Sequence, residues 1–174
     1  RSPSRGLGDV YKRQIGWVPE HIQDGRFGKW LEAARDWCIS RDRYWGTPLP
    51  IWICKKCKHE ICIDSIKNLT KQSSEAANYK DLDLHRPYID NISLTCPKCN
   101  DVMIRTPEVL DAWYDSGAMP FAQHNTTSDL ELKNLQNSSS IPADYICEAI
   151  DQTRGWFYTL HSISTMLTGS TSLN

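Results

Sequence analysis

The sequence predicts a mixed α/β fold that is interrupted by a small cysteine-rich insert. Two pairs of cysteines with C-x-x-C spacing, Cys54 with Cys57 and Cys96 with Cys99, each lie between short apolar segments typical of strands. Further along the chain, residues 143–147 are also typical of a strand, and a helical pattern follows them from Asp151. A strand that runs into a helix is half of a βα unit, from which open α/β sheets are built.

The composition fits one domain, or one domain with a small insert. The chain has 174 residues, of which 40% are hydrophobic, so a core can form. Its formal net charge of −1 gives no argument for binding to nucleic acid or to a membrane surface, although it allows a local basic surface. No apolar run approaches the roughly 20 residues of a transmembrane helix, and we expect no membrane partner.

The first 14 residues differ from the rest of the chain. Residues 1–14 have no apolar periodicity and resemble translated adapter or vector sequence joined to a coding region. The alternative is a disordered polar leader. In either case we expect them to lie outside the fold.

The elements that follow are predicted from periodicity and from turn residues. Apolar residues at helical spacing predict an amphipathic helix over residues 27–38. Two prolines then force an extended path over residues 47–50, and residues 51–53 and 59–63 are typical of a hairpin around the first cysteine pair. A short helix is predicted at residues 65–69 in a polar stretch, and residues 89–95 and 102–105 lead into and out of the second pair.

The last part of the chain is predicted to combine a loop and a helix. Residues 123–140 are polar and indicate a solvated loop. In the helix that begins at Asp151, Trp156, Leu160, Ile163 and Leu167 form one apolar stripe, which ends at Gly169.

The two cysteine pairs predict a zinc site with Cys54, Cys57, Cys96 and Cys99 as ligands. Each C-x-x-C pair places two thiolates on one tight turn, and two such turns supply a tetrahedral Zn²⁺ site. Four unrelated buried cysteines or a redox pair are the alternatives, and His59 is a spare candidate ligand. Four sulfur ligands leave no open position for a catalytic water, so the zinc is expected to be structural.

The chain has seven cysteines, so three remain outside the predicted metal site. Cys38, Cys62 and Cys147 lie in apolar stretches and are predicted to be buried thiols. This cysteine usage suits a reducing cytosol or organelle matrix better than secretion.

Four segments, in order, resemble class I aminoacyl-tRNA synthetases, and most closely the isoleucyl-tRNA synthetase family. The third is similar to that family's D-x-W-F-D/E-S-G-S-M-P motif and the fourth to its E-G-x-D-Q-x-R-G-W-F motif. The segments are D-W-C-I-S-R-D-R-Y-W-G-T-P-L-P-I-W at 36–52, D-L-H-R-P-Y-I-D at 83–90, D-A-W-Y-D-S-G-A-M-P at 111–120 and E-A-I-D-Q-T-R-G-W-F at 148–157. The resemblance covers nearly everything between residues 17 and 168.

Two positions depart from the family pattern. Ala149 stands where the family has glycine, and Ala118 stands where it has serine. A methyl group at residue 149 is expected to crowd a backbone that approaches a ligand. The valyl and leucyl enzymes are alternatives. The valyl version of residues 43–48 usually ends differently, and the leucyl enzyme shares R-Y-W-G-T-P but differs in its later blocks.

The resemblance implies a domain organisation. Residues 15–53 would begin the catalytic segment that follows the editing domain, residues 54–105 would form a zinc-ribbon insert, and residues 106–174 would form part of a Rossmann-like catalytic domain. The family joins isoleucine to ATP, which is bound with Mg²⁺, and transfers the isoleucyl group from the adenylate to tRNA(Ile). It is expected to act in the cytoplasm or in an organelle.

The resemblance also implies roles for individual residues. Glu148, Asp151 and Gln152 would bind the aminoacyl-adenylate, while Trp113 and Trp156, with Gln152, would form the isoleucine pocket. From spacing alone, Asp151 is typical of a helix N-cap and Trp156 of core packing, and the family match favours the binding roles. Arg41 and Arg43 would either face tRNA or anchor the domain.

The family's two ATP-binding signatures, similar to H-I-G-H and K-M-S-K-S, do not occur in this sequence, nor does its editing domain. We therefore expect a fragment that has no catalytic residue of its own, that cannot activate isoleucine alone and that needs the rest of the same polypeptide. A stand-alone zinc-ribbon module that binds nucleic acid or protein is the rival hypothesis, but it leaves residues 148–157 unexplained.

Overall fold

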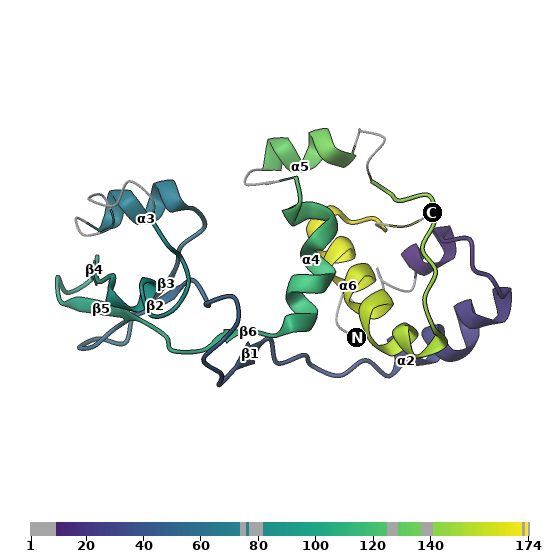
Figure 1. Ribbon diagram of the computed structural model, residues 1–174, viewed down its shortest axis with the longest axis horizontal. Coiled ribbons are helices and arrows are strands. Elements are labelled where there is room, and N and C mark those ends of the chain that lie inside the picture. Colours follow the sequence, from purple (N-terminus) through teal and green to yellow (C-terminus); the bar gives the residue numbers. More distant parts are fainter. Residues whose placement is uncertain are drawn as a thin grey trace. The chain divides into compact units, whose positions relative to one another are not determined.

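The computed structural model describes residues 10–73, 76, 82–124, 129–136, 141–171 and 173, with only the backbone of residues 129 and 130. These residues form two compact units (Figure 1). One unit contains the described residues up to Trp37 and those from Trp113 onward, and the other is Cys38–Ala112. The predicted insert, residues 54–105, lies inside the second unit.

The second unit is built on a four-stranded antiparallel sheet in the order β3-β2-β5-β4. Its strands are β2 (Ile51–Cys54), β3 (Glu60–Cys62), β4 (Leu94–Thr95) and β5 (Val102–Arg105). Burial alternates along the two central strands, so Trp52 and Cys54 share the buried face with Met103 and Arg105. That face carries the core of the unit.

Short helices complete this core. Helix α3 (Ile66–Gln72) begins at Ser65, whose hydroxyl oxygen accepts a hydrogen bond from the Asn68 backbone N–H at 3.2 Å. Leu69 of α3 and Ile89 of η5 (Ile89–Asn91) pack in the cluster that contains Trp52. The Trp52 indole N–H donates to the Ile92 carbonyl at 2.9 Å, which satisfies its polar atom inside the core.

A second, two-stranded sheet joins the beginning and the end of this unit. Strand β1 (Ser40–Arg41) pairs antiparallel with β6 (Val109–Leu110). Gly46 lies against β6 with a φ of 148°, and a Cβ atom there would lie 3.0 Å from the Val109 side chain. Glycine is therefore required at residue 46, because a side chain would meet both backbone strain and a steric clash.

In the first unit, helices α4 (Ala112–Ala122) and α6 (Trp156–Thr168) lie side by side (Figure 1). Gly117 permits the close approach, because a Cβ atom on it would lie 2.9 Å from Thr159 and from Ile163. Phe121 and Ile163 share a cluster with Leu135 of α5 (Asp129–Gln136). The Trp156 indole N–H also donates to the Ser116 carbonyl at 3.0 Å, which joins α6 to α4.

Short helices before residue 37 form the rest of this unit: η1 (Lys12–Gln14), η2 (Glu20–Ile22), the π-helical turn η3 (Gln23–Phe27) and α2 (Gly28–Glu32). Phe27 is fully buried and contacts the rings of Trp17 and His161. The 3-10 helix η6 (Ile150–Arg154) precedes α6. No helix in the described part of the chain is long and apolar enough to cross a membrane.

The predicted hairpin, the short helix near Ser65 and the end of the last helix at Gly169 are confirmed. Gly169 adopts a φ of 63°, the left-handed conformation that ends a helix. Within the apolar stripe, Leu160 and Ile163 are buried, whereas Leu167 is exposed.

Four predictions about elements were wrong. The helix predicted over residues 27–38 ends at Glu32, and residues 129–136 of the predicted loop form α5. Residues 143–147 form no strand, although Ala143 makes an isolated parallel bridge with Leu173. Tyr145 is 81% exposed, and this segment does not pair along its length with any described strand. Asp151 lies within η6, and α6 begins only after Gly155.

The predicted leader lies partly outside the described residues. Residues 1–9 are not described, but residues 12–14 form η1. Lys12 is buried and its ammonium group pairs with Asp24 at 3.2 Å. The expectation of disorder is therefore wrong for these residues.

Replacing Gly117 with alanine tests the approach of α4 to α6. The added methyl group meets the Thr159 backbone, which cannot move as a flexible side chain would. We expect Gly117→Ala to lower the free energy of unfolding by about 1–3 kcal/mol, measured by urea denaturation. The matched control is Gly16→Ala, because a Cβ atom at Gly16 meets nothing within 4 Å. Equal stability of the two variants would contradict the tight contact.

Candidate functional site

The two C-x-x-C turns have the same backbone construction. In the first, the Cys54 N–H donates to the His59 carbonyl at 2.8 Å and the Lys58 N–H donates to the Cys54 carbonyl at 3.2 Å. In the second, Cys96 and Asn100 make the equivalent bonds at 2.8 and 2.9 Å. Lys58 and Asn100 both adopt positive φ, 59° and 56°. The two turns therefore present their thiols in matching geometry.

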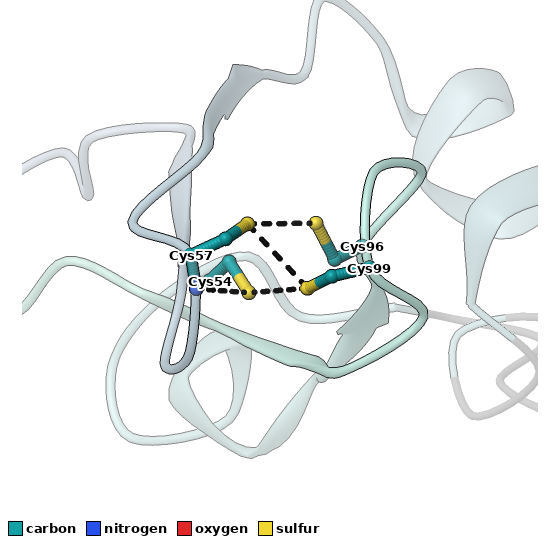
Figure 2. Close-up of side chains that lie close together, drawn as sticks. All are labelled: Cys54, Cys57, Cys96 and Cys99. Atoms are coloured by element: carbon teal, nitrogen blue, oxygen red, sulfur yellow. Dashed lines mark hydrogen bonds between the residues drawn. The ribbon is translucent and has the colours of Figure 1, made fainter.

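The four thiols converge at one point (Figure 2). All four sulfur atoms lie within 4.8 Å of one another. Cys99 lies 3.4 Å from both Cys54 and Cys57, and Cys57 lies 3.6 Å from Cys96, measured between Sγ atoms. Tetrahedral zinc with Zn–S bonds of about 2.3 Å would separate its sulfur ligands by roughly 3.8 Å. The arrangement fits such an ion, and the group of potential ligands does not include His59.

The ionisation of the thiols differs across the cluster. The Cys57 backbone N–H donates to the Cys54 sulfur and lowers the pKa of that thiol to about 6, despite its burial. The Asp101 backbone N–H lowers the pKa of Cys99, but burial and the neighbouring thiols raise it overall to about 12. Four thiolates cannot be held together without a cation, so binding of a divalent metal is expected to release protons.

The remaining cysteines are not buried. Cys38, Cys62 and Cys147 are all exposed, so the prediction of three buried thiols was wrong. Apolar neighbours in the sequence did not indicate burial, because these residues lie at the ends of short strands or in coil. They serve as internal controls for the four clustered cysteines.

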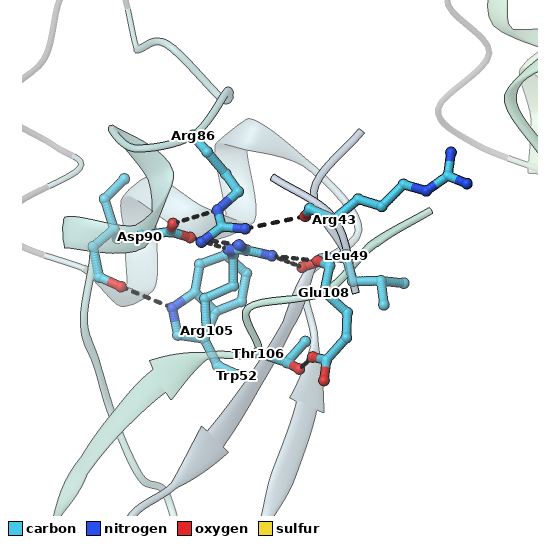
Figure 3. Close-up of polar contacts among 9 residues, drawn as sticks. Arg43, Leu49, Trp52, Arg86, Asp90, Arg105, Thr106 and Glu108 are labelled. Atoms are coloured by element: carbon cyan, nitrogen blue, oxygen red, sulfur yellow. Dashed lines mark hydrogen bonds and ion pairs between the residues drawn. The ribbon is translucent and has the colours of Figure 1, made fainter. Parts of the chain in front are cut away.

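An arginine-centred network supports the unit that carries the cluster (Figure 3). The Arg105 side chain is 1% exposed and its Nε donates to Asp90 at 2.7 Å. Its guanidinium also donates to the Leu49 and Glu108 carbonyls. Arg86 donates to the other Asp90 oxygen at 2.8 Å. A buried arginine is thus fully engaged, as burial of a charge requires.

Arg41 anchors the small sheet. Its guanidinium donates to Asp111 at 2.6 Å, and the Asp111 side chain is 8% exposed. Of the two roles considered for Arg41, this contact favours the anchor. Arg43 is exposed, and its backbone carbonyl accepts a bond from Arg86.

A second group of predicted site residues meets in the first unit. A Cβ atom on Gly155 would lie 3.0 Å from the Trp113 ring and 2.9 Å from the Gln152 side-chain oxygen. That oxygen accepts the Trp156 backbone N–H at 3.0 Å. The Trp113 and Gln152 side chains therefore lie against Gly155, where η6 meets α6, and Gln152 is hydrogen-bonded to the Trp156 backbone.

The other predicted binding residues lie nearby in the sequence and are exposed. Asp151 accepts a hydrogen bond from the Gln152 amide at 3.3 Å. Glu148 precedes η6 with its side chain in solvent. Ala149 adopts φ −66° and ψ 155°, an extended conformation open to any residue, so its methyl group causes no backbone strain. Ala118 packs against the cluster of Phe121 and Ile163.

The sequence alone did not reveal the helix cap. Gln152, rather than Asp151, satisfies the first free N–H of α6, because the 3-10 turn places residue 152 beneath it. Gln152 was selected by the family motif and not by its capping role.

Comparison with known proteins identifies the family. The model of the class I tRNA synthetases for isoleucine, leucine, methionine and valine matches residues 7–173. The chain belongs to the class I tRNA synthetases. The match includes both the four-cysteine cluster and the residues around Gly155.

Individual synthetases are similar over most of the chain. The isoleucine–tRNA ligase of Dehalococcoides mccartyi strain 195 is 52% identical over 155 residues, 89% of this chain and 15% of the ligase. That of Clostridium novyi is 54% identical over 88% of this chain and 14% of the ligase. Isoleucine–tRNA ligase 2 of Bacillus cereus is 50% identical over 89% of this chain. The chain spans about 15% of the length of these synthetases.

Serine substitution tests the metal centre. We expect the chain to bind one Zn²⁺, and Cys96→Ser to weaken zinc binding by more than about 100-fold, since even lost outer-shell partners cost 10–100-fold. The measurement is competition with a chromophoric chelator. Cys62→Ser, which alters an exposed thiol outside the cluster, should bind zinc normally. Equal zinc affinity of the two variants would argue against the site.

The Asp90 network predicts a pH-dependent stability. Burial raises the pKa of Asp90, but hydrogen bonds and charge from Arg86 and Arg105 outweigh burial and hold it below its usual value. The stabilisation of the fold by ionised Asp90 is therefore complete above the unfolded-state pKa of the Asp90 carboxyl, about 3.9. It is lost as pH falls through the lower pKa that this carboxyl has in the folded state.

Asp90→Ala leaves the buried Arg105 without its carboxylate partner. We expect a loss of about 3 kcal/mol at pH 7, measured by thermal and urea unfolding, and a smaller difference from the unchanged chain below pH 4. Asp42→Ala is the control, since Asp42 is exposed. A pH-independent difference would show that the ion pair does not stabilise the fold.

Proposed function

We propose that this chain forms part of an isoleucine–tRNA ligase and contributes to its site for isoleucyl-adenylate. The observation that carries the proposal is the contact of Trp113 and Gln152 at Gly155, together with the hydrogen bond between Gln152 and the Trp156 backbone. Identities of 50–54% to isoleucine–tRNA ligases support isoleucine over leucine, methionine or valine as the amino acid. The remainder of the ligase, ATP with Mg²⁺, isoleucine and tRNA(Ile) would be its partners, in the cytoplasm.

The reaction places a particular demand on these residues. An isoleucine carboxylate oxygen bonds to the α-phosphorus of ATP, the bond to the bridging oxygen breaks, and pyrophosphate leaves. A terminal hydroxyl of tRNA then attacks the activated carbonyl and AMP leaves. Both steps depend on orientation and on charge stabilisation, so the residues of this chain would bind and position the adenylate.

Glu148, Asp151 and Gln152 would provide the polar contacts. Glu148 and Asp151 are exposed carboxylates on either side of the entry to η6, suited to a substrate ammonium group or ribose hydroxyls. The Gln152 oxygen is held by the Trp156 N–H, which leaves its amide nitrogen able to donate to a ligand while it contacts Asp151.

Trp113 and Trp156 would provide the apolar walls for the isoleucine side chain. Trp156 is fixed by its indole hydrogen bond to Ser116, and Trp113 is 45% exposed beside Gly155. Such walls exclude larger side chains but discriminate weakly against one missing methylene, a limit for which isoleucine–tRNA ligase is the standard illustration.

We also propose that residues 54–105 form a zinc ribbon and residues 106–174 part of a Rossmann-like catalytic domain. Cys54, Cys57, Cys96 and Cys99 would hold one structural Zn²⁺, which would fix the fold of the insert and take no part in the reaction. The matching construction of the two turns supports the ribbon, and the family match supports the Rossmann-like domain.

The test uses a chimera in which this chain replaces the matching segment of the Dehalococcoides mccartyi ligase. The chimera should catalyse isoleucine-dependent pyrophosphate exchange. Glu148→Gln should lower kcat/KM for isoleucine by about 10- to 100-fold, the cost of one charge-assisted hydrogen bond. Asp144→Asn, another exposed carboxylate in the same segment, should leave it unchanged.

Two results would contradict the proposal. An active chimera that is insensitive to Glu148→Gln would remove that residue from the site. Pyrophosphate exchange that depends on valine or leucine rather than isoleucine would show that isoleucine is not the substrate.

A further inference from the structure

The turn that carries Asp151 and Gln152 is attached to a segment far away in the sequence. Arg26, in η3, donates from Nε to the Thr153 hydroxyl oxygen at 3.1 Å, across 127 positions of the chain. The Thr153 hydroxyl in turn donates to the Ile150 carbonyl at 2.7 Å and so closes the turn. Thr153 is only 2% exposed, so this hydroxyl has little access to water as a substitute partner.

A second contact joins the same two segments. The Arg154 guanidinium lies 5.3 Å from the centre of the Trp30 ring, within the range of a cation–π interaction. Trp30 also packs edge-on against Tyr158 of α6. Thr153 and Arg154, the two residues that follow Gln152, are thus both tied to residues 26–30.

The turn needs such support because its own hydrogen bonds are few. Helix η6 has five residues, and its N-cap, Ala149, has no side chain that caps it. A 3-10 helix of this length has poor hydrogen-bond geometry and depends on tertiary contacts. The position of Gln152 is therefore set from one side by the Trp156 N–H and from the other by the Thr153 contact.

We propose that Arg26 is a positioning residue for the amino-acid site, acting through Thr153 to hold Gln152 in its binding orientation. This rests on the proposed function, because it takes Gln152 to contact the ligand. Arg26 itself contacts no reacting atom. Loss of the contact should loosen η6 and weaken isoleucine binding, while the chemistry of bound substrate continues.

The first test measures hydrogen–deuterium exchange on the full chain. Arg26→Ala and Thr153→Val should both speed exchange of the amides in residues 150–156 by about five- to tenfold, as expected for the loss of one ordinary hydrogen bond made by an exposed side chain. Thr153→Ser keeps the hydroxyl, so its amides in residues 150–156 should exchange as slowly as those of the unchanged chain. Lys29→Ala, which removes an exposed charge three residues away, should have no effect there. The double variant should be no faster than Thr153→Val alone, because that substitution already removes the Arg26 contact together with the bond to Ile150.

The second test measures pyrophosphate exchange by the chimeric ligase. Arg26→Ala should raise KM for isoleucine about fivefold with kcat nearly unchanged, the pattern of lost uniform binding. A residue that only stabilised the fold would instead lower apparent kcat by reducing the folded fraction.

Each outcome decides the proposal. Unchanged hydrogen exchange overturns it, and so does faster exchange with an unchanged KM. An active chimera that is impaired by Glu148→Gln but not by Arg26→Ala overturns only the role of Arg26. An inactive chimera counts against the proposed function itself, and the proposal about Arg26 falls with it.

Discussion

The candidate binding residues depend on the close approach of α4 to α6. Gly117 has no side chain, so the backbone of α6 can lie where a methyl group would otherwise be. The Trp156 indole then reaches the Ser116 carbonyl, and Trp113, at the start of α4, reaches Gly155. One small residue thus allows α4 and α6 to lie close together, with the Trp113 ring at the junction between η6 and α6. A larger residue would separate them without altering any of the predicted binding residues.

A different constraint governs the unit that contains the cysteines. Two turns with equivalent hydrogen bonds, each with a residue of positive φ at the same position (Lys58 and Asn100), bring four sulfur atoms within 4.8 Å of one another. Around them, Arg105 is buried but fully paired with Asp90 and with backbone carbonyls. The shape of this unit therefore comes from polar groups and from the clustered thiols as well as from the apolar cluster around Trp52. Small units with limited cores commonly depend on such additional links.

The sequence predicted the parts of the fold that rest on local patterns. C-x-x-C spacing located the cysteine cluster, the short apolar segment before the first pair located β2, and Gly169 located the end of α6. Predictions failed where tertiary contacts decide: residues 143–147 have an apolar pattern but no neighbouring strand along them, and the polar residues 129–136 are helical. Gln152 as the cap of α6 and Arg26 as the partner of Thr153 could not be predicted, because neither contact follows from spacing. The family motif selected Gln152 without explaining its geometry.

The most direct test of the account is the structure of the chimeric ligase bound to a non-hydrolysable isoleucyl-adenylate analogue. The account predicts that the isoleucine side chain lies against Trp113 and Trp156, with Gln152 within hydrogen-bonding distance of the ligand. A ligand bound elsewhere, with Trp113 and Trp156 packed only against protein, would contradict it.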